Sequence, residues 1–296
     1  MTTPHLHAST GIGLWLVWLL IVAIAALYAR AAALRPHWSP WRTAAFGAGA
    51  ALLLVGFSTP VVGWAHADLR GHMAQHLLLG MFAPLLLVLG APVTLLLASL
   101  PTRAARRVVR VLGHGALRFV THPITTLALN VGGMVVLYAT PLFAMSQREP
   151  WLHALVHYHF VAAGCLFSWA IAGPDPAPHR PSLRVRGLVL FVGIAIHSVL
   201  AKLMYVHGWP RGTHATLEEI RAAAQWMYYG GDLAEMLLLA ALLALWWRRP
   251  RAYRGAGPRS MNQSRAWSRV DHAGITRALR SSGHRPMEPA HEPQPR

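Results

Sequence analysis

Seven apolar stretches, each long enough to cross a membrane as a helix, follow one another along this chain. A helix needs about 20 mostly apolar residues to span roughly 30 Å of hydrocarbon. The stretches are 14–34, 43–64, 73–97, 124–143, 151–172, 187–207 and 226–247. This pattern predicts an all-α fold, a polytopic transmembrane bundle of seven spans.

The composition agrees with a lipid environment and argues against a soluble nucleic-acid binder. Only 12% of the residues are charged, whereas soluble domains carry roughly 25%. The net charge of +17 comes from arginines that lie between the apolar stretches and in the last fifty residues. We therefore expect no nucleic-acid partner. The single cysteine, Cys165, rules out an intramolecular disulfide and a cysteine-based zinc site.

The arginines also predict the orientation of the chain. Twenty-two of them lie in alternate connections and in the segment after residue 247, against four in the remaining loops. Because cytoplasmic loops carry the excess of basic residues, the amino terminus is expected outside a cell membrane and the carboxyl terminus in the cytoplasm. Residues 1–13 would be a short outer segment, 14–247 the transmembrane domain, and 248–296 a disordered basic tail that contacts anionic lipids.

Two histidine pairs lie near the predicted outer ends of the spans. His72 and His76 are four residues apart at the start of the third span, and His153 and His157 have the same spacing in the fifth. Residues at this spacing share one helix face about 6 Å apart. Each pair therefore brings two imidazoles close enough to bind one metal ion.

Thioether and carboxylate side chains accompany these imidazoles. Imidazole together with thioether favours copper, so the four histidines are candidate nitrogen ligands, with Met73 or Met236 as supplementary sulfur ligands. Asp68 or Asp232 would not bind the metal directly but would hydrogen-bond to the ligating rings and so fix their tautomers. Glu235, next to Met236, is an ionisable residue within a span and has no assigned role.

Each of these residues also has a purely structural interpretation. A single histidine at a membrane interface is more often a headgroup anchor or an interhelical hydrogen-bonding residue, and His197 is expected to be a packed polar side chain. Lys202 and Asp232 lie at similar depths, so they are predicted to form an ion pair. Only the two histidine pairs taken together favour a metal site.

Several short motifs carry a resemblance to a known family. They are GHMAQHLLLG at 71–80, APLLLVLGAP at 83–92, THP at 121–123, WLHALVH at 151–157, GPDPAPH at 173–179 and YYGGD at 228–232. In these segments the chain resembles the CtaG family of membrane proteins, which are required for the assembly of caa-type cytochrome c oxidase. The resemblance covers roughly residues 10 to 250.

The resemblance implies an integral membrane assembly factor of the respiratory chain, not an enzyme, with cytochrome c oxidase subunits as partners and copper as the delivered metal. The histidines of the family motif map onto His72, His76 and His157. Relatives often have a glutamate just before the histidine of the fifth span, where this chain has Val156. Any role of that acid would pass to Asp232 or Glu235.

Three other classes of function remain open from the sequence. A membrane metalloenzyme of the histidine-box type would bind di-iron, but its histidines would cluster on the cytoplasmic side. A copper permease or resistance protein would need ligands that continue through the bilayer, and copper uptake into sealed vesicles would reveal it. A haem-binding bundle would be identified by its absorption spectrum.

Overall fold

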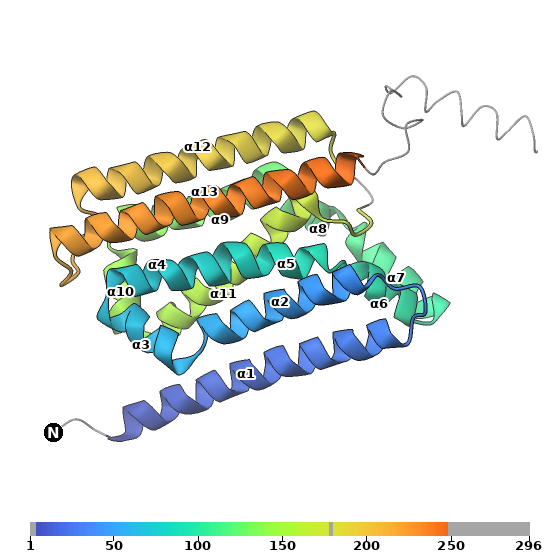
Figure 1. Ribbon diagram of the computed structural model, residues 1–296, viewed down its shortest axis with the longest axis horizontal. Helices are drawn as coiled ribbons and strands as arrows, with labels where there is room; N and C mark the ends of the chain where they lie inside the picture. The colour runs from blue at the N-terminus through green and yellow to red at the C-terminus, as the bar shows by residue number, and fades with distance from the viewer. Residues whose placement is uncertain (1–3, 178–179, 248–296) are drawn as a thin grey trace, which may run out of the picture. The chain divides into compact units, whose positions relative to one another are not determined.

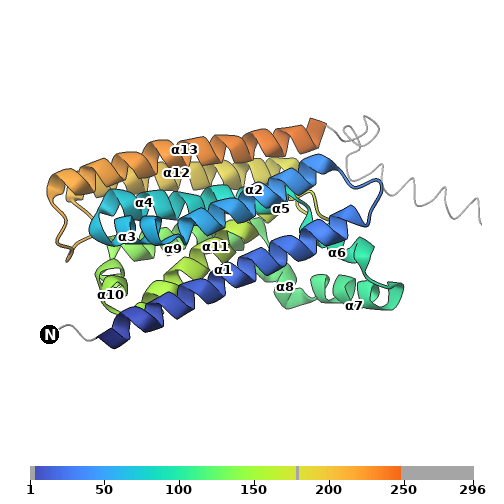
Figure 2. The same ribbon diagram turned by 60° about the horizontal axis from the view of Figure 1, so that its bottom comes forward.

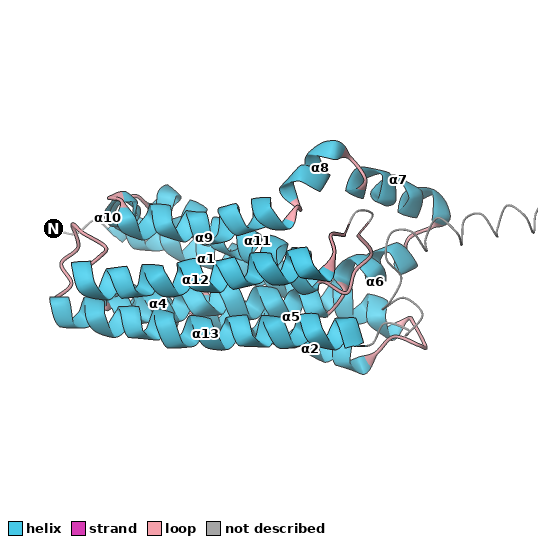
Figure 3. Ribbon diagram, turned by 90° about the horizontal axis from the view of Figure 1, so that it is seen from above, coloured by secondary structure: helices cyan, strands magenta, loops and turns pink. Residues whose placement is uncertain are grey.

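The computed structural model describes residues 4–177 and 180–247, and this part of the chain consists of helices and loops only (Figure 3). The predicted disordered tail, 248–296, lies outside the described residues. The helices, in chain order, are α1 (Pro4–Ala33), α2 (Pro40–Gly56), α3 (Thr59–Ala67), α4 (Leu69–Leu77), the π-helical segment η1 (Leu78–Phe82), α5 (Ala83–Leu89), α6 (Pro92–Ser99), α7 (Thr102–Leu112), α8 (Gly115–Val120), α9 (Pro123–Ala139), α10 (Leu142–Arg148), α11 (Pro150–Ala172), α12 (Leu183–His207) and α13 (Leu217–Trp247).

The all-α membrane fold is confirmed, and the count of spans depends on how two bent helix pairs are treated. Five helical stretches are long and apolar enough to cross a membrane alone: Gly13–Ala33, Leu69–Leu89, Pro150–Ala172, Leu183–His207 and Leu217–Trp247. The pairs α2–α3 and α9–α10 qualify only when each pair is taken as one span, bent by 53° and 81°. The two pairs raise the number to seven.

Prolines mark the places where the helices begin or bend. Pro40, Pro92, Pro123 and Pro150 open α2, α6, α9 and α11, because the first turn of a helix needs no proline N–H. Pro141 separates α9 from α10 at the sharper bend. The predicted third span, 73–97, is wrong at its end, since Ala91 adopts φ 53° before Pro92 and the straight helix stops at Leu89.

A π-helical turn lets two helices cross closely at glycines. Pro84 has no N–H for the carbonyl of Gly80, four residues earlier, and η1 precedes it. On α11, a Cβ added to Gly164 would lie 2.1 Å from the Gly80 oxygen. Only glycine at position 164 allows this approach between α11 and the span formed by α4, η1 and α5.

Successive connections lie at opposite ends of the bundle (Figure 1). We call one end the histidine end, where α3, α10 and the α12–α13 loop lie. The other is the arginine end, where α6, α7 and α8 lie, with α7 and α8 standing off the bundle (Figure 2). Membrane orientation, with the histidine end outside, stays a prediction. Two boundaries also differ from expectation: α1 starts at Pro4 and α13 at Leu217.

Candidate metal centre

Four imidazoles form a row that runs from the surface of the histidine end into the bundle. Its members, which we call the histidine row, are His66 on α3, His153 and His157 on α11, and His72 on α4. Their ring centroids are 5.0 Å apart from His66 to His153, 4.4 Å from His153 to His157 and 6.4 Å from His157 to His72. His66 is exposed, His153 half-buried, and the other two are buried. The two predicted pairs are therefore brought together by α4 and α11.

Aromatic rings enclose the inner imidazoles. The His72 ring lies edge-on to Phe143 at 4.8 Å between centroids, and the His76 ring lies edge-on to Phe160 at 4.6 Å. Tyr138 is 6.3 Å from both. Neither nitrogen of His72 or of His76 has a hydrogen-bond partner. Burial in apolar surroundings favours the neutral imidazole, which keeps a lone pair available for a metal ion.

Gln75 of α4 contacts the His157 ring of α11. Its amide nitrogen donates to the Gly56 carbonyl at 2.8 Å, which leaves its Oε1 facing His157 Nε2 at 2.9 Å. Since an amide oxygen only accepts, Nε2 is the donor in this contact, while Nδ1 faces the His153 carbonyl oxygen at 3.2 Å. Asp68 and Asp232, which were predicted to fix a ring tautomer, contact Arg70 and Ser198, and the side chain that contacts His157 is Gln75.

A cavity of about 470 Å³ opens at the outer end of the histidine row. It is bordered by His66, His214 and Asp68, and on its inner side by Phe143. Phe143 also lies against the His72 ring, so this side chain contacts both the cavity and one of the buried imidazoles. The cavity is a route by which a small ion or a partner's side chain could approach the row.

The other predicted site residues lie apart from the row. Asp68 caps α4 by accepting from the Arg70 N–H, and the Arg70 side chain binds the same carboxylate. These hydrogen bonds from Arg70 hold the pKa of the Asp68 carboxyl below its ordinary value. Met73 is fully buried, and its sulfur accepts from the Tyr138 hydroxyl at 3.8 Å. Met236 is 58% exposed on the bundle's surface.

The predicted ion pair between Lys202 and Asp232 is wrong. Lys202 Nζ lies 5.3 Å from the centre of the Tyr228 ring, and Asp232 accepts from the Ser198 hydroxyl at 3.3 Å. The acid of α13 that lies near a nitrogen-containing side chain is Glu235 instead, whose Oε1 is 3.6 Å from His197 Nδ1. Within residues 4–177 and 180–247, no three histidine, cysteine, aspartate or glutamate side chains form a preformed metal site.

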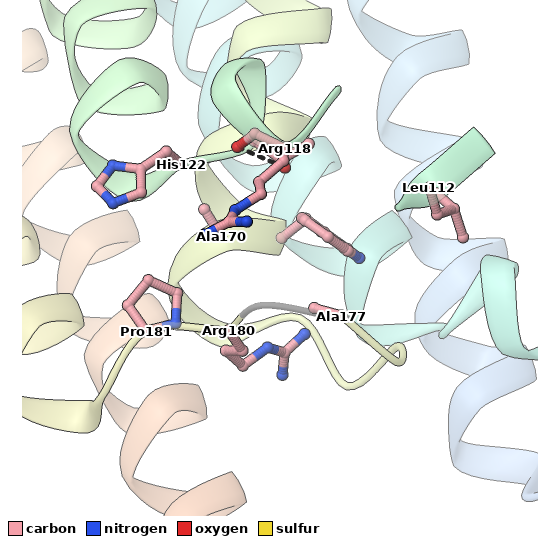
Figure 4. A pocket seen from close by; sticks show the side chains of 9 residues that line it. Leu112, Arg118, His122, Ala170, Ala177, Arg180 and Pro181 are labelled. Carbon is pink, nitrogen blue, oxygen red and sulfur yellow. Dashed lines mark hydrogen bonds between the residues drawn. The ribbon is translucent and has the colours of Figure 1, made fainter. Parts of the chain in front are cut away.

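Two of the remaining motifs, at 121–123 and 173–177, contribute residues that cap helices at the arginine end. The buried Asp175 carboxylate accepts from the Thr94 N–H at 2.7 Å and from its hydroxyl at 2.6 Å, and so caps α6. His122 caps α9, accepting from the Ile124 N–H. Nearby, a basic cavity of about 170 Å³ is bordered by Arg118 and Arg180 (Figure 4). Its cationic character suits anionic groups and not a metal ion.

Three features of the site were missed by sequence reasoning. Gln75 stands in the quoted motif but was given no role, although a polar residue in a span between two histidines was a signal. The contact of His66 with His153 was not predicted, because it depends on the bend between α2 and α3. The aromatic enclosure had no sequence signal, because Phe143 and Phe160 lie on other helices.

Comparisons with known proteins give one family and a set of relatives. The family described as "Cytochrome c oxidase caa3 assembly factor" matches residues 18–249. An uncharacterized protein of Mycobacterium bovis is 38% identical over 177 residues, which cover 56% of this chain and 27% of that protein. An uncharacterized protein of Mycobacterium leprae is 33% identical over 232 residues, covering 71% of this chain and 35% of that protein. The chain thus spans about a third or less of these relatives. No solved structure matches it.

Proposed function

This chain belongs to the caa3 cytochrome c oxidase assembly factors, and from that membership we propose that it binds copper at the histidine end and passes it to an oxidase subunit. It acts in the cell membrane as an assembly factor and not as an enzyme. The histidine end faces outward, and the client is the copper-receiving subunit of the oxidase.

One observation carries this proposal: His72 and His157, from different helices, lie buried with ring centroids 6.4 Å apart. Metal–nitrogen bonds are about 2.0 Å long, so two imidazoles on opposite sides of one ion have centroids roughly 6 Å apart. The separation in this structure is close to that arrangement. Buried polar atoms in proteins almost always have a partner. The two nitrogens of His72 have none, and a bound metal ion would provide it.

The ligands around the site suit temporary binding of copper for transfer rather than permanent binding. Imidazole donors suit copper, and the chain has no second cysteine to hold the ion with paired thiolates. The row offers the ion several neighbouring imidazoles between the exposed His66 and the buried His72. Ligand exchange from ring to ring would carry copper along the row without release into water.

The test measures copper bound per chain. The full-length protein is purified in detergent, incubated with Cu⁺ under anaerobic reducing conditions and separated from free metal. We expect the variant His72→Ala/His76→Ala/His157→Ala to retain at least one copper fewer than the wild type. Equal copper in both proteins would refute the assignment of the site.

The matched control is the variant His37→Ala/His114→Ala/His122→Ala. It also removes three histidines, all of them exposed and near the arginine end, and it should bind as much copper as the wild type. In cells, the oxidase of a deletion strain should regain its copper and activity with the control variant but not with the first one.

A further inference from the structure

A second group of unpartnered polar atoms lies deeper in the bundle than the histidine row. His197 of α12 is fully buried, and Glu235 of α13 is 6% exposed. The distance of 3.6 Å between Nδ1 and Oε1 exceeds that of a hydrogen bond. Both nitrogens of His197 and the other carboxylate oxygen of Glu235 have no hydrogen-bond partner. An ionisable pair left this way inside a span is costly, which makes it a candidate functional site.

The backbone of α13 is shaped around this imidazole. A Cβ added to Gly231 would lie 1.9 Å from His197 Cε1. The ring therefore occupies space that any other residue at 231 would fill. Gly231 is one turn before Glu235 on the same helix, so the glycine admits the ring at the position where the acid can meet it.

A small cavity adjoins Glu235 and reaches Gly80, the glycine next to the His76 ring. Its volume is about 20 Å³, and it is bordered by Glu235, Asn130 and Ser168, which is enough space and polarity for one water molecule. Gly80 also borders it. A Cβ on Gly80 would be 3.4 Å from His76 Cε1, so the cavity and the unpartnered His76 ring both lie next to this glycine.

We propose that His197 and Glu235 form a second copper site, which exchanges its ion with the histidine row through His76. Metal–nitrogen and metal–oxygen bonds are each about 2.0–2.2 Å long, so one ion can join two atoms up to roughly 4.2 Å apart. The observed 3.6 Å fits a bent arrangement, and a water in the cavity supplies a further ligand. The exchange of copper with the histidine row rests on the proposed function. Copper binding by His197 and Glu235 does not depend on it.

The donor set points to copper bound by nitrogen and oxygen. Imidazole suits copper and zinc, and carboxylate and water suit harder ions, so the pair favours Cu²⁺ more than the histidine row, which has only imidazoles, does. The carboxylate also balances part of the ion's charge, which an apolar bundle requires.

The experiment counts bound copper in single variants of the full-length protein in detergent, after incubation with Cu⁺ and, separately, with Cu²⁺. We expect two equivalents for the wild type and one for His197→Gln or Glu235→Gln, in at least one oxidation state. The row variant His72→Ala/His76→Ala/His157→Ala should keep the copper held by His197 and Glu235. Undiminished copper in both single variants, in both oxidation states, would overturn the proposal.

Two controls separate a metal site from a structural pair. Asp232→Asn and Ser198→Ala change a polar contact between the same two helices and should leave both equivalents in place. The second readout is the unfolding temperature with and without copper, because a ligand stabilises only the protein that binds it. Copper should raise this temperature less in Glu235→Gln than in Asp232→Asn. An equal rise in the two variants would mean that the pair is structural.

The outcomes also distinguish this proposal from the proposed function. Loss of copper in Glu235→Gln with none lost in the row variant would refute the row as a site and keep the second site. The reverse result would keep the row and refute the second site.

Discussion

Gln75 links three helices through two hydrogen bonds. It satisfies the last carbonyl of α2, at Gly56, and orients His157 on α11. A helix leaves its last carbonyls without partners in the helix itself, and in hydrocarbon no water replaces them. The polar residue between the two histidines of the motif thus has both a structural and a positioning role.

Replacing Gln75 with leucine should destabilise the protein by about 1 kcal/mol, because interhelical hydrogen bonds in membranes contribute about 0.6 kcal/mol each. The fraction unfolded in mixtures of mild and denaturing detergent measures this change. The same variant should bind copper about 10-fold more weakly, as expected when a residue that orients a ligand is lost. Gln225→Leu, at an exposed position, is the control, and equal destabilisation in both would contradict the role of Gln75.

Asp68 gives the histidine end a pH-dependent contact. Its hydrogen bonds with Arg70 lower the pKa of the carboxyl in the folded state, so the stability they add is present above the ordinary value of 3.8 and is lost as pH falls through the lowered pKa. Asp68→Asn should cost about 0.2–1 kcal/mol at neutral pH. The difference between wild type and variant in detergent unfolding should vanish below that lowered value, and a constant difference at every pH would argue against the ion pair.

At the scale of helices, the crossing of α11 over η1 depends on Gly164. Its Cβ-free backbone meets the Gly80 carbonyl that Pro84 leaves without its usual partner. This crossing places Phe160 against His76 and sets how far α11 approaches α4. The geometry of the histidine row therefore depends on residues that carry no chemistry themselves.

Gly164→Ala should cost about 1–3 kcal/mol, the usual range for overpacking, and should lower copper binding by displacing α11. Gly132→Ala is the matched control, because a Cβ there meets nothing within 4 Å. Detergent unfolding of the two variants, side by side, tests this. A Gly164 variant as stable as the Gly132 variant would show that the crossing can relax.

The helix α7 is amphipathic and has no buried residue. Arg103, Arg106, Arg107 and Arg110 share one face, and Val108 lies on the other. Such a helix is suited to lie at a membrane surface, where each arginine contributes about 1 kcal/mol of attraction to anionic lipid.

Neutralising these arginines should release α7 from anionic bilayers. A fluorophore on Val109→Cys, in a Cys165→Ala background, should report a more apolar environment in vesicles with anionic lipid than in zwitterionic ones. The variant with glutamine at all four arginine positions should lose that difference. Fluorescence that changes neither with lipid charge nor with the arginine substitutions would show that α7 does not contact the headgroups.

For the whole molecule, the distribution of arginines predicts that the histidine end faces outward. Single cysteines in a Cys165→Ala background test this: Arg211→Cys lies at the histidine end and Thr102→Cys at the arginine end, both exposed. A membrane-impermeant thiol reagent added to intact cells should label the first and spare the second until the cells are opened. The opposite labelling pattern would show that the histidine end faces the cytoplasm and would contradict copper delivery on the outer side.

The fold class and the two histidine pairs followed from the sequence alone, because both depend on local order. Hydropathy over some 20 residues determines whether a segment crosses a lipid bilayer, and spacing by four places His72 with His76, and His153 with His157, on one helix face. None of these features requires knowing which helices are neighbours.

Only the tertiary structure decided which side chains meet across helices. The contacts of His157 with Gln75, of His66 with His153 and of His197 with Glu235 depend on how each helix is rotated and how closely it packs. Those quantities are determined by glycines, bends and aromatic side chains distributed over the whole chain. Sequence spacing says nothing about them, and for that reason Asp232 was predicted to pair with Lys202, whereas in the structure it accepts from Ser198 and Lys202 lies over the Tyr228 ring.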